Sequence, residues 1–214
     1  MRRRIVLLIA LGLAGNTLPA QRRPRLELVV PAQASLAMEG PEVRGINVLA
    51  DREMRDLLRN GFPARLHYRV ELWSTSGWFD DLEGGTEWDV VVRYDALDKS
   101  YRLARLEGDR VTSLGRYDQL RDAERALEQP FRAPIAARGR ARRYYYRAVL
   151  SVETLSLSDL DEVERWLRGE LRPAIRGQRN PGTALTRGVR TLFIRLLGGE
   201  KREYEVRSAA FRPA

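Results

Sequence analysis

Acidic and aromatic side chains crowd into one short run of the sequence, ELWSTSGWFDDLEGGTEWDVV at residues 71–91. Three of the four tryptophans lie in this run, together with Asp80, Asp81 and Glu83. Two carboxyl groups on opposite sides of a sugar bond are the equipment of a glycoside hydrolase, and aromatic rings suit a sugar. Neighbouring side chains diverge in an extended segment, however, and no distant carboxylate is placed opposite them by the sequence. We therefore favour a solvated turn flanked by core aromatic residues, with a hydrolase as an alternative.

The sequence contains few residues that could bind a metal ion or act as a nucleophile. The calcium-loop spacing D-x-D-x-D-G is absent from the acidic run. His67 is the only histidine and there is no cysteine, which excludes a His-rich zinc centre and a thiol nucleophile. His67 lies between Arg65 and Arg69 on the polar side of an alternating segment, so we interpret it as a surface residue. The sequence predicts no catalytic residue, no metal site and no cofactor.

Arginines gather in a second stretch, FRAPIAARGRARR at residues 131–143, which we expect to be an exposed arm. It continues directly into three tyrosines at residues 144–146, and a further basic stretch follows at 172–190. Cations interleaved with aromatic rings are typical of surfaces that bind anions. Arginine runs in loops are usually solvated, however, so we favour a solvated loop, with an anionic partner as the alternative. The candidate binding residues for an anionic lipid or polyanion are Arg138, Arg140, Arg142 and Arg143.

Hydropathy periodicity indicates the elements that must position these residues. A capped helix is predicted from Asp51 to the Asn60-Gly61 stop, and further helical spacing covers residues 117–127, 159–167 and 185–197. Period-2 alternation predicts strands at 26–30, 64–73, 87–94, 101–106, 144–155 and 202–211. A further strand is predicted from residue 46, directly before the first helix.

The pattern of these elements predicts the fold class. Strands outnumber helices, the connections are short, and the alternation of strand and helix that builds a parallel sheet is missing. We therefore expect an antiparallel α+β domain, a β-meander with helices packed on one side. A β-sandwich with helical insertions is the alternative. The length of 214 residues suits one domain, residues 21–214.

The N-terminal segment indicates export. Three arginines, an apolar run from Ile5 to about Gly15, and the small residue Ala20 form the layout of a signal peptide over residues 1–20. Leu18 fits the cleavage rule poorly, so an N-terminal anchor in the inner membrane is the alternative to a periplasmic or extracellular protein. No later stretch is apolar enough to span a membrane. Without cysteine, neither lipidation nor a disulfide framework is available.

The charge balance is basic but does not require nucleic acid. Removal of residues 1–20, with their three arginines, would lower the formal net charge from +9 to +6. The sequence pI of about 10.4 follows from the arginine content. We expect no nucleic-acid partner for an exported protein.

The order of several short motifs resembles a bacterial family of exported proteins known as domain of unknown function 4390. Gly61-Phe62-Pro63 follows a short helix, Glu71-Leu72-Trp73 ends a strand, Trp78-Phe79-Asp80 forms a Trp-rich hairpin, and Trp88 through Tyr94, Leu97 and Tyr101 fit a strand pair. The resemblance covers residues 46–168 and implies export and a β-rich domain. It carries no assigned activity, cofactor or catalytic residue, and it makes the Trp-rich run a structural hairpin.

These observations lead to three readings of function. The first is a non-enzymatic accessory or binding protein of the bacterial envelope, with envelope proteins or an anionic lipid surface as partners. The second is a binder of anionic lipid or polyanion through the arginine arm. The third is a hydrolase that uses the acidic residues of the hairpin.

Overall fold

The computed structural model describes residues 23–75, 78–139, 142–155 and 201–213, and the fold is antiparallel and β-rich, as predicted. The predicted signal peptide, the predicted helices at 159–167 and 185–197 and the basic stretch at 172–190 lie outside the described residues. The elements are β1 Arg25–Val29, η1 Gln33–Ser35, β2 Glu42–Ile46, α1 Arg52–Arg59, β3 Ala64–Thr75, β4 Asp80–Asp95, β5 Ser100–Glu107, β6 Arg110–Tyr117, α2 Leu120–Leu127, β7 Phe131–Arg132, β8 Arg143–Thr154 and β9 Arg202–Arg207.

A large sheet of six strands, in the order β6-β5-β4-β3-β8-β9, forms the frame of the domain. The strands β3 to β6 run as the predicted meander, extended by one strand. The alternating sequence of β3 puts Leu66, Tyr68 and Val70 on one face of this sheet, where they are buried. The same alternation buries Tyr146, Ala148, Leu150 and Val152 of β8 against the same core. Period-2 patterning therefore set the two faces of the central strands.

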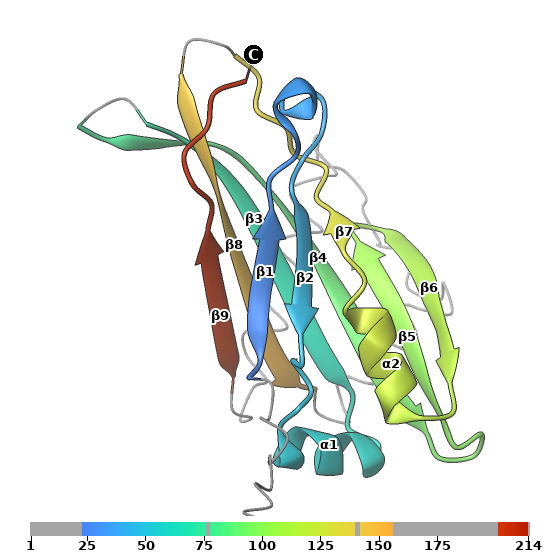
Figure 1. Cartoon of the computed structure of the whole chain (residues 1–214). Helices are drawn as coiled ribbons and strands as arrows, with labels where there is room; N and C mark the ends of the chain where they lie inside the picture. The colour runs from blue at the N-terminus through green and yellow to red at the C-terminus, as the bar shows by residue number, and fades with distance from the viewer. Residues whose placement is uncertain (1–22, 76–77, 140–141, 156–200, 214) are drawn as a thin grey trace, which may run out of the picture.

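A small sheet, β1-β2-β7, lies across one face of the large sheet (Figure 1). The core lies between the two sheets, with Leu26 and Val43 of the small sheet in the same cluster as Leu66 and Leu150 of the large one. Close approach requires glycine at Gly45, because a Cβ there would lie 2.9 Å from the Tyr68 hydroxyl. The second sheet gives the domain a sandwich-like section within its α+β class.

The two helices close the core. The Asp51 side chain accepts a hydrogen bond from the Met54 N–H at 3.0 Å, which is the predicted N-cap of α1. Gly61 follows the helix with a positive φ of 90°. Helices commonly end with a residue in this region, which glycine adopts most easily. The helix α2 lies beside β7 over the same face of the large sheet (Figure 1). It begins at Leu120 rather than residue 117, because Tyr117 ends the edge strand β6.

Three local predictions were wrong. The strand predicted from residue 46 ends there, because β2 spans Glu42–Ile46, where it pairs with β1. The acidic residues 80–83 are not a turn between strands but the start of β4, because the hairpin stays paired, past one bulge, up to Thr75 and Asp80. The arm is not exposed throughout. Ala133 and Ala137 are fully buried, and the Ala133 N–H donates to the Pro41 carbonyl at 2.9 Å. Backbone pairing with the small sheet therefore holds the first half of the arm in place.

Candidate functional site

The tip of the β3–β4 hairpin, the arginine arm and the C-terminal segment lie at the same end of the molecule (Figure 1). Strand register shows how they meet. Thr75 pairs with both Asp80 of the hairpin and Arg143 at the start of β8. Tyr144 forms a bridge with Phe211, which brings the last residues beside the arm. We call this region the arginine end and define it by Trp78, Leu82, Arg138, Arg142, Arg143, Arg207 and Arg212.

The hairpin tip exposes large apolar side chains. Trp78 is 93% exposed, Leu82 is 56% exposed, and Phe79 between them is also exposed. Trp88, ten residues later in the same hairpin, is only 3% exposed, since it stacks on Tyr68. The prediction that the tryptophans of this run are structural is therefore confirmed for Trp88. It is wrong for Trp78, whose side chain lies on the surface and not in the core.

The acidic residues of the hairpin are engaged by neighbouring side chains. Asp80 Oδ2 accepts a hydrogen bond from the Tyr145 hydroxyl at 2.9 Å and lies 3.6 Å from the Arg207 guanidinium. Glu83 forms an ion pair with Arg142 at 2.7 Å. Asp81 follows Asp80 in the strand, so its side chain points to the opposite face. The three carboxylates do not converge on one point, and the geometry lends no support to a hydrolase.

The arginines that the sequence singled out come together with two others. Arg138, Arg142 and Arg143 are exposed at this end, and Arg140 lies outside the described residues. Arg212 is exposed next to Phe211, and Arg207 lies with its guanidinium carbon 3.5 Å from the centre of the Tyr145 ring. Sequence reasoning missed Arg207, Arg212 and the exposure of Trp78. Only strand pairing brings the C-terminal segment to the arm.

His67 lies in a separate charged network on the outer face of the large sheet, away from the small sheet. Its Nδ1 is 2.8 Å from Asp89 Oδ1, and Arg65 contacts both oxygens of Asp89 at 2.9 and 3.0 Å. Arg65 also donates to Glu153 at 3.0 Å. Burial alone would raise the pKa of Asp89, but the hydrogen bond with His67 and the charge and hydrogen bonds of Arg65 hold it below its usual value. The network keeps a carboxylate ionised within a sheet.

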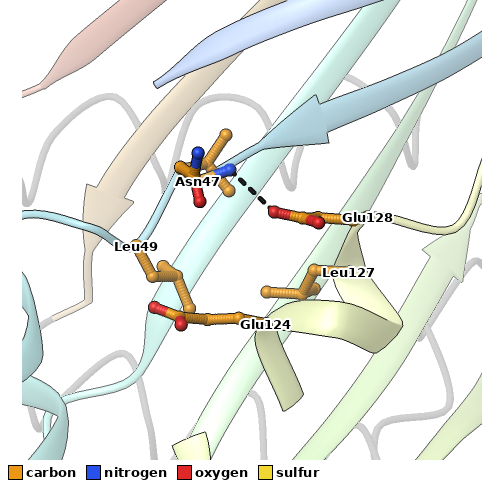
Figure 2. Close-up of a pocket in the computed structure, with 6 residues that line it drawn as sticks. Asn47, Leu49, Glu124, Leu127 and Glu128 are labelled. Carbon is orange, nitrogen blue, oxygen red and sulfur yellow. Dashed lines mark hydrogen bonds between the residues drawn. The ribbon is translucent and has the colours of Figure 1, made fainter. Parts of the chain in front are cut away.

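A crevice between the β2–α1 connection and α2 is filled by its own lining (Figure 2). The Asn47 N–H donates to Glu128 Oε1 at 3.1 Å across it, and Leu49 and Leu127 pack below. The Glu124 carboxylate forms an ion pair with the Arg55 guanidinium at 2.8 Å. No room is left for a water molecule, so this crevice holds the helix against the sheet and offers no ligand site.

Among the described residues, no group of three or more histidine and acidic side chains is arranged to hold a metal ion. No helix in the described part of the chain is long and apolar enough to cross a membrane.

The model of one protein family, a domain of unknown function (DUF4390), matches residues 44–165. These limits agree closely with the range of residues 46–168 over which the motif order shows its resemblance. No curated protein and no solved structure matches the chain. The matched range includes the β3–β4 hairpin and the arginine arm, whereas Arg207 and Arg212 follow it.

Proposed function

Because this chain belongs to the DUF4390 family, whose model covers more than half of it, we propose that it is an exported binding module of the bacterial envelope that acts without catalysis. Its binding surface is the arginine end. The observation that carries this proposal is the exposure of Trp78 on a hairpin whose base lies against Arg142, Arg143 and Arg207. Tryptophan and arginine are the residues most enriched in binding hot spots.

The strand geometry supports a binding surface rather than a frayed end. The two strands β3 and β4 stay paired up to Thr75 and Asp80, with one bulge at Glu83, so the tip is carried on paired strands. Tyr145 and Arg207 contact Asp80 from the two next strands, β8 and β9. An exposed aromatic residue on such a support loses little conformational entropy when it binds.

The N-terminal segment supports export. The basic head, the apolar run and the small residue at position 20 are the features that a translocon reads. Determination of the N-terminal residue of protein from the periplasmic fraction tests this part. We expect a start near Gln21, or Met1 in the membrane fraction if the segment stays as an anchor. Protein that starts at Met1 in the soluble cytoplasmic fraction would overturn export.

Site-specific photocrosslinking in living cells tests the binding surface. A photoreactive amino acid at position 78 is expected to give adducts in the envelope fraction. The matched control is position 97, because Leu97 is 96% exposed at the turn that follows the other end of β4. Equal adduct formation from the two positions would overturn the arginine end as the binding surface.

A further inference from the structure

We propose that the partner of the arginine end is a membrane surface that contains anionic phospholipid, with Trp78 entering the headgroup layer. This inference rests on the proposed function and names its partner. It follows from the shape of the hairpin tip, from the charge around it and from the strands that support it.

The shape of the tip favours a lipid layer over a protein partner. The hairpin projects beyond the neighbouring strands (Figure 1), and its most exposed large side chain is Trp78. A protein partner would need a pocket complementary to this protrusion, whereas a fluid headgroup layer accepts it without one. Tryptophan prefers the boundary between lipid and water, because its ring is apolar and its N–H is polar. Leu82, 56% exposed near the tip, adds apolar area beside it.

The charge around the tip is complementary to anionic headgroups. Three arginines lie against the hairpin, since Arg142 contacts Glu83, Arg207 contacts Asp80 and Arg143 pairs with Thr75. Arg138 and Arg212 lie farther along the same end, next to Tyr144 and to its bridge partner Phe211. The carboxylates of the hairpin at this end are those of Asp80, Asp81 and Glu83. Two of these carboxylates already have cationic partners, Arg207 and Arg142. Within the described part of the chain, the side chains of Arg138, Arg143 and Arg212 form no ion pair. These three cations remain available to phosphate oxygens, which arginine binds well.

The strands that support the tip hold its apolar side chains and the neighbouring arginines close enough to act together. Arg143 is paired with Thr75, three residues before Trp78, and Arg142 is bound to Glu83, one residue after Leu82. The start of β8 therefore holds two cations against the base of the apolar tip, one beside β3 and one reaching β4. When the indole enters the headgroup layer, the arginines reach the phosphates that surround it. Each basic residue at an anionic surface changes the binding constant by about fivefold, equivalent to ~1 kcal/mol.

Vesicle co-sedimentation with protein purified from the envelope tests this inference. The probes are vesicles of equal parts phosphatidylglycerol and phosphatidylethanolamine, compared with pure phosphatidylcholine vesicles. We expect wild type to bind only the anionic vesicles, and to lose binding as salt screens the charges. Trp78→Ser and the variant with Gln at Arg138, Arg140, Arg142 and Arg143 should each bind at least ~10-fold more weakly.

Two matched control variants show whether the loss of vesicle binding is specific to the arginine end. One removes an exposed apolar side chain elsewhere, and the other removes the same number of exposed positive charges elsewhere. Leu97→Ser removes an equally exposed apolar residue elsewhere. Gln at Arg52, Arg59, Arg121 and Arg125 removes four exposed charges from the two helices. Both should bind like wild type. All variants share one N-terminus, so any affinity of that segment for lipid cancels. Quenching by brominated lipid should be stronger for wild type than for Trp78→Phe, which assigns the inserted ring to Trp78.

Each remaining outcome decides against the inference. Wild type that does not bind anionic vesicles at low salt overturns it, as does equal binding by wild type and Trp78→Ser. If position 78 gives protein adducts in the envelope while vesicle binding is absent, the proposed function stands and the lipid partner is wrong. If neither adducts nor vesicle binding depends on position 78, the proposed function fails as well.

Discussion

Tyr145 donates its phenolic hydrogen to Oδ2 of Asp80 over 2.9 Å, and so joins the base of the projecting hairpin to β8, two strands away from β4. The ring of Tyr145 lies between Trp73 and the guanidinium of Arg207. Burial and the hydrogen bond to Asp80 both raise the pKa of Tyr145, in that order. One buried phenol thus sets the position of the hairpin that carries Trp78.

Removal of this hydrogen bond should loosen the hairpin base. Tyr145→Phe leaves the Asp80 carboxylate without its donor, and a hydrogen bond to a charged group contributes ~1.5–3 kcal/mol. We expect a loss of about 2 kcal/mol in the free energy of unfolding, measured by urea denaturation. Asp80→Asn keeps an oxygen that can accept the same hydrogen bond, so it should cost less than ~1 kcal/mol. Equal losses in the two variants would show that the hydrogen bond does not hold the base.

The tryptophans of the hairpin should differ sharply in their effect on stability. Trp88 is buried between Tyr68 and Phe131, with ring centres 5.0 and 4.8 Å away, so Trp88→Ala should cost ~3–5 kcal/mol. Trp78→Ala should stay within ~0.5 kcal/mol, since the ring lies in solvent. Thermal melts of the two variants test this. A large loss from Trp78→Ala would mean that this ring packs against the protein.

The network around Asp89 should make stability depend on pH. Its folded-state pKa lies below the ordinary aspartate value of ~3.9, so the ionised form stabilises the fold. This contribution is complete above about pH 4 and is lost as pH falls through the lower folded-state pKa. We expect Asp89→Asn to cost ~3 kcal/mol at pH 7, because it removes one of two carboxylates that pair with the largely buried Arg65, and clearly less at pH 3. Urea denaturation at both pH values measures the difference.

A surface ion pair provides the control for this experiment. Glu27 contacts Arg25 and Arg44, each at 2.7 Å, on an accessible part of β1. Exposed ion pairs contribute little to stability, so Glu27→Gln should cost less than ~1 kcal/mol at pH 7. A loss from Asp89→Asn that is the same at pH 3 and pH 7 would contradict the assignment of the pH effect to this carboxylate.

Gly40 should be the least tolerant glycine at the junction of the arm and the small sheet. A Cβ at this position would lie 1.9 Å from the Ala133 carbonyl oxygen and 2.5 Å from that of Ile135, both of them backbone atoms. Gly40→Ala must therefore push the arm away, and we expect a loss of about 2–3 kcal/mol in thermal melts. At Gly84 the nearest atom is the Ile135 side chain at 3.5 Å, an ordinary contact, so Gly84→Ala should be tolerated.

Arginine replacement in the arm should leave the fold intact. The first half of the arm is held by the buried Ala133 and Ala137, whereas Arg138, Arg142 and Arg143 are exposed. The ion pair of Arg142 with Glu83 is solvent-exposed, and exposed ion pairs contribute little to stability. Gln at these three positions and at Arg140 should therefore shift the melting temperature by only a few degrees. A shift above ten degrees would show that the arginines hold the arm.

Part of the candidate site could be predicted from residues alone. The run of arginines before Tyr144 and the cluster of acids after Trp78 are visible in the sequence. Their relation is not, because Arg142 and Glu83 are 59 residues apart and meet only through the register of β8, β3 and β4. Arg212 reaches the same end through the bridge between Phe211 and Tyr144. Non-local strand pairing leaves no signal in the spacing of these residues.

The sequence by itself determined the central strands and the first helix. Alternation in β3 and β8 and the Asp51 cap are local patterns, and local physics suffices to interpret them. Only the tertiary structure decided the edge strand β6, whose residues alternate weakly and extend because they pair with β5. It also decided which tryptophan is buried. Trp78 and Trp88 share one hairpin, but only Trp88 lies where Phe131, from the distant strand β7, can cover it. Burial of a large apolar ring depends on what the rest of the chain places over it, and that is a property of the packed molecule.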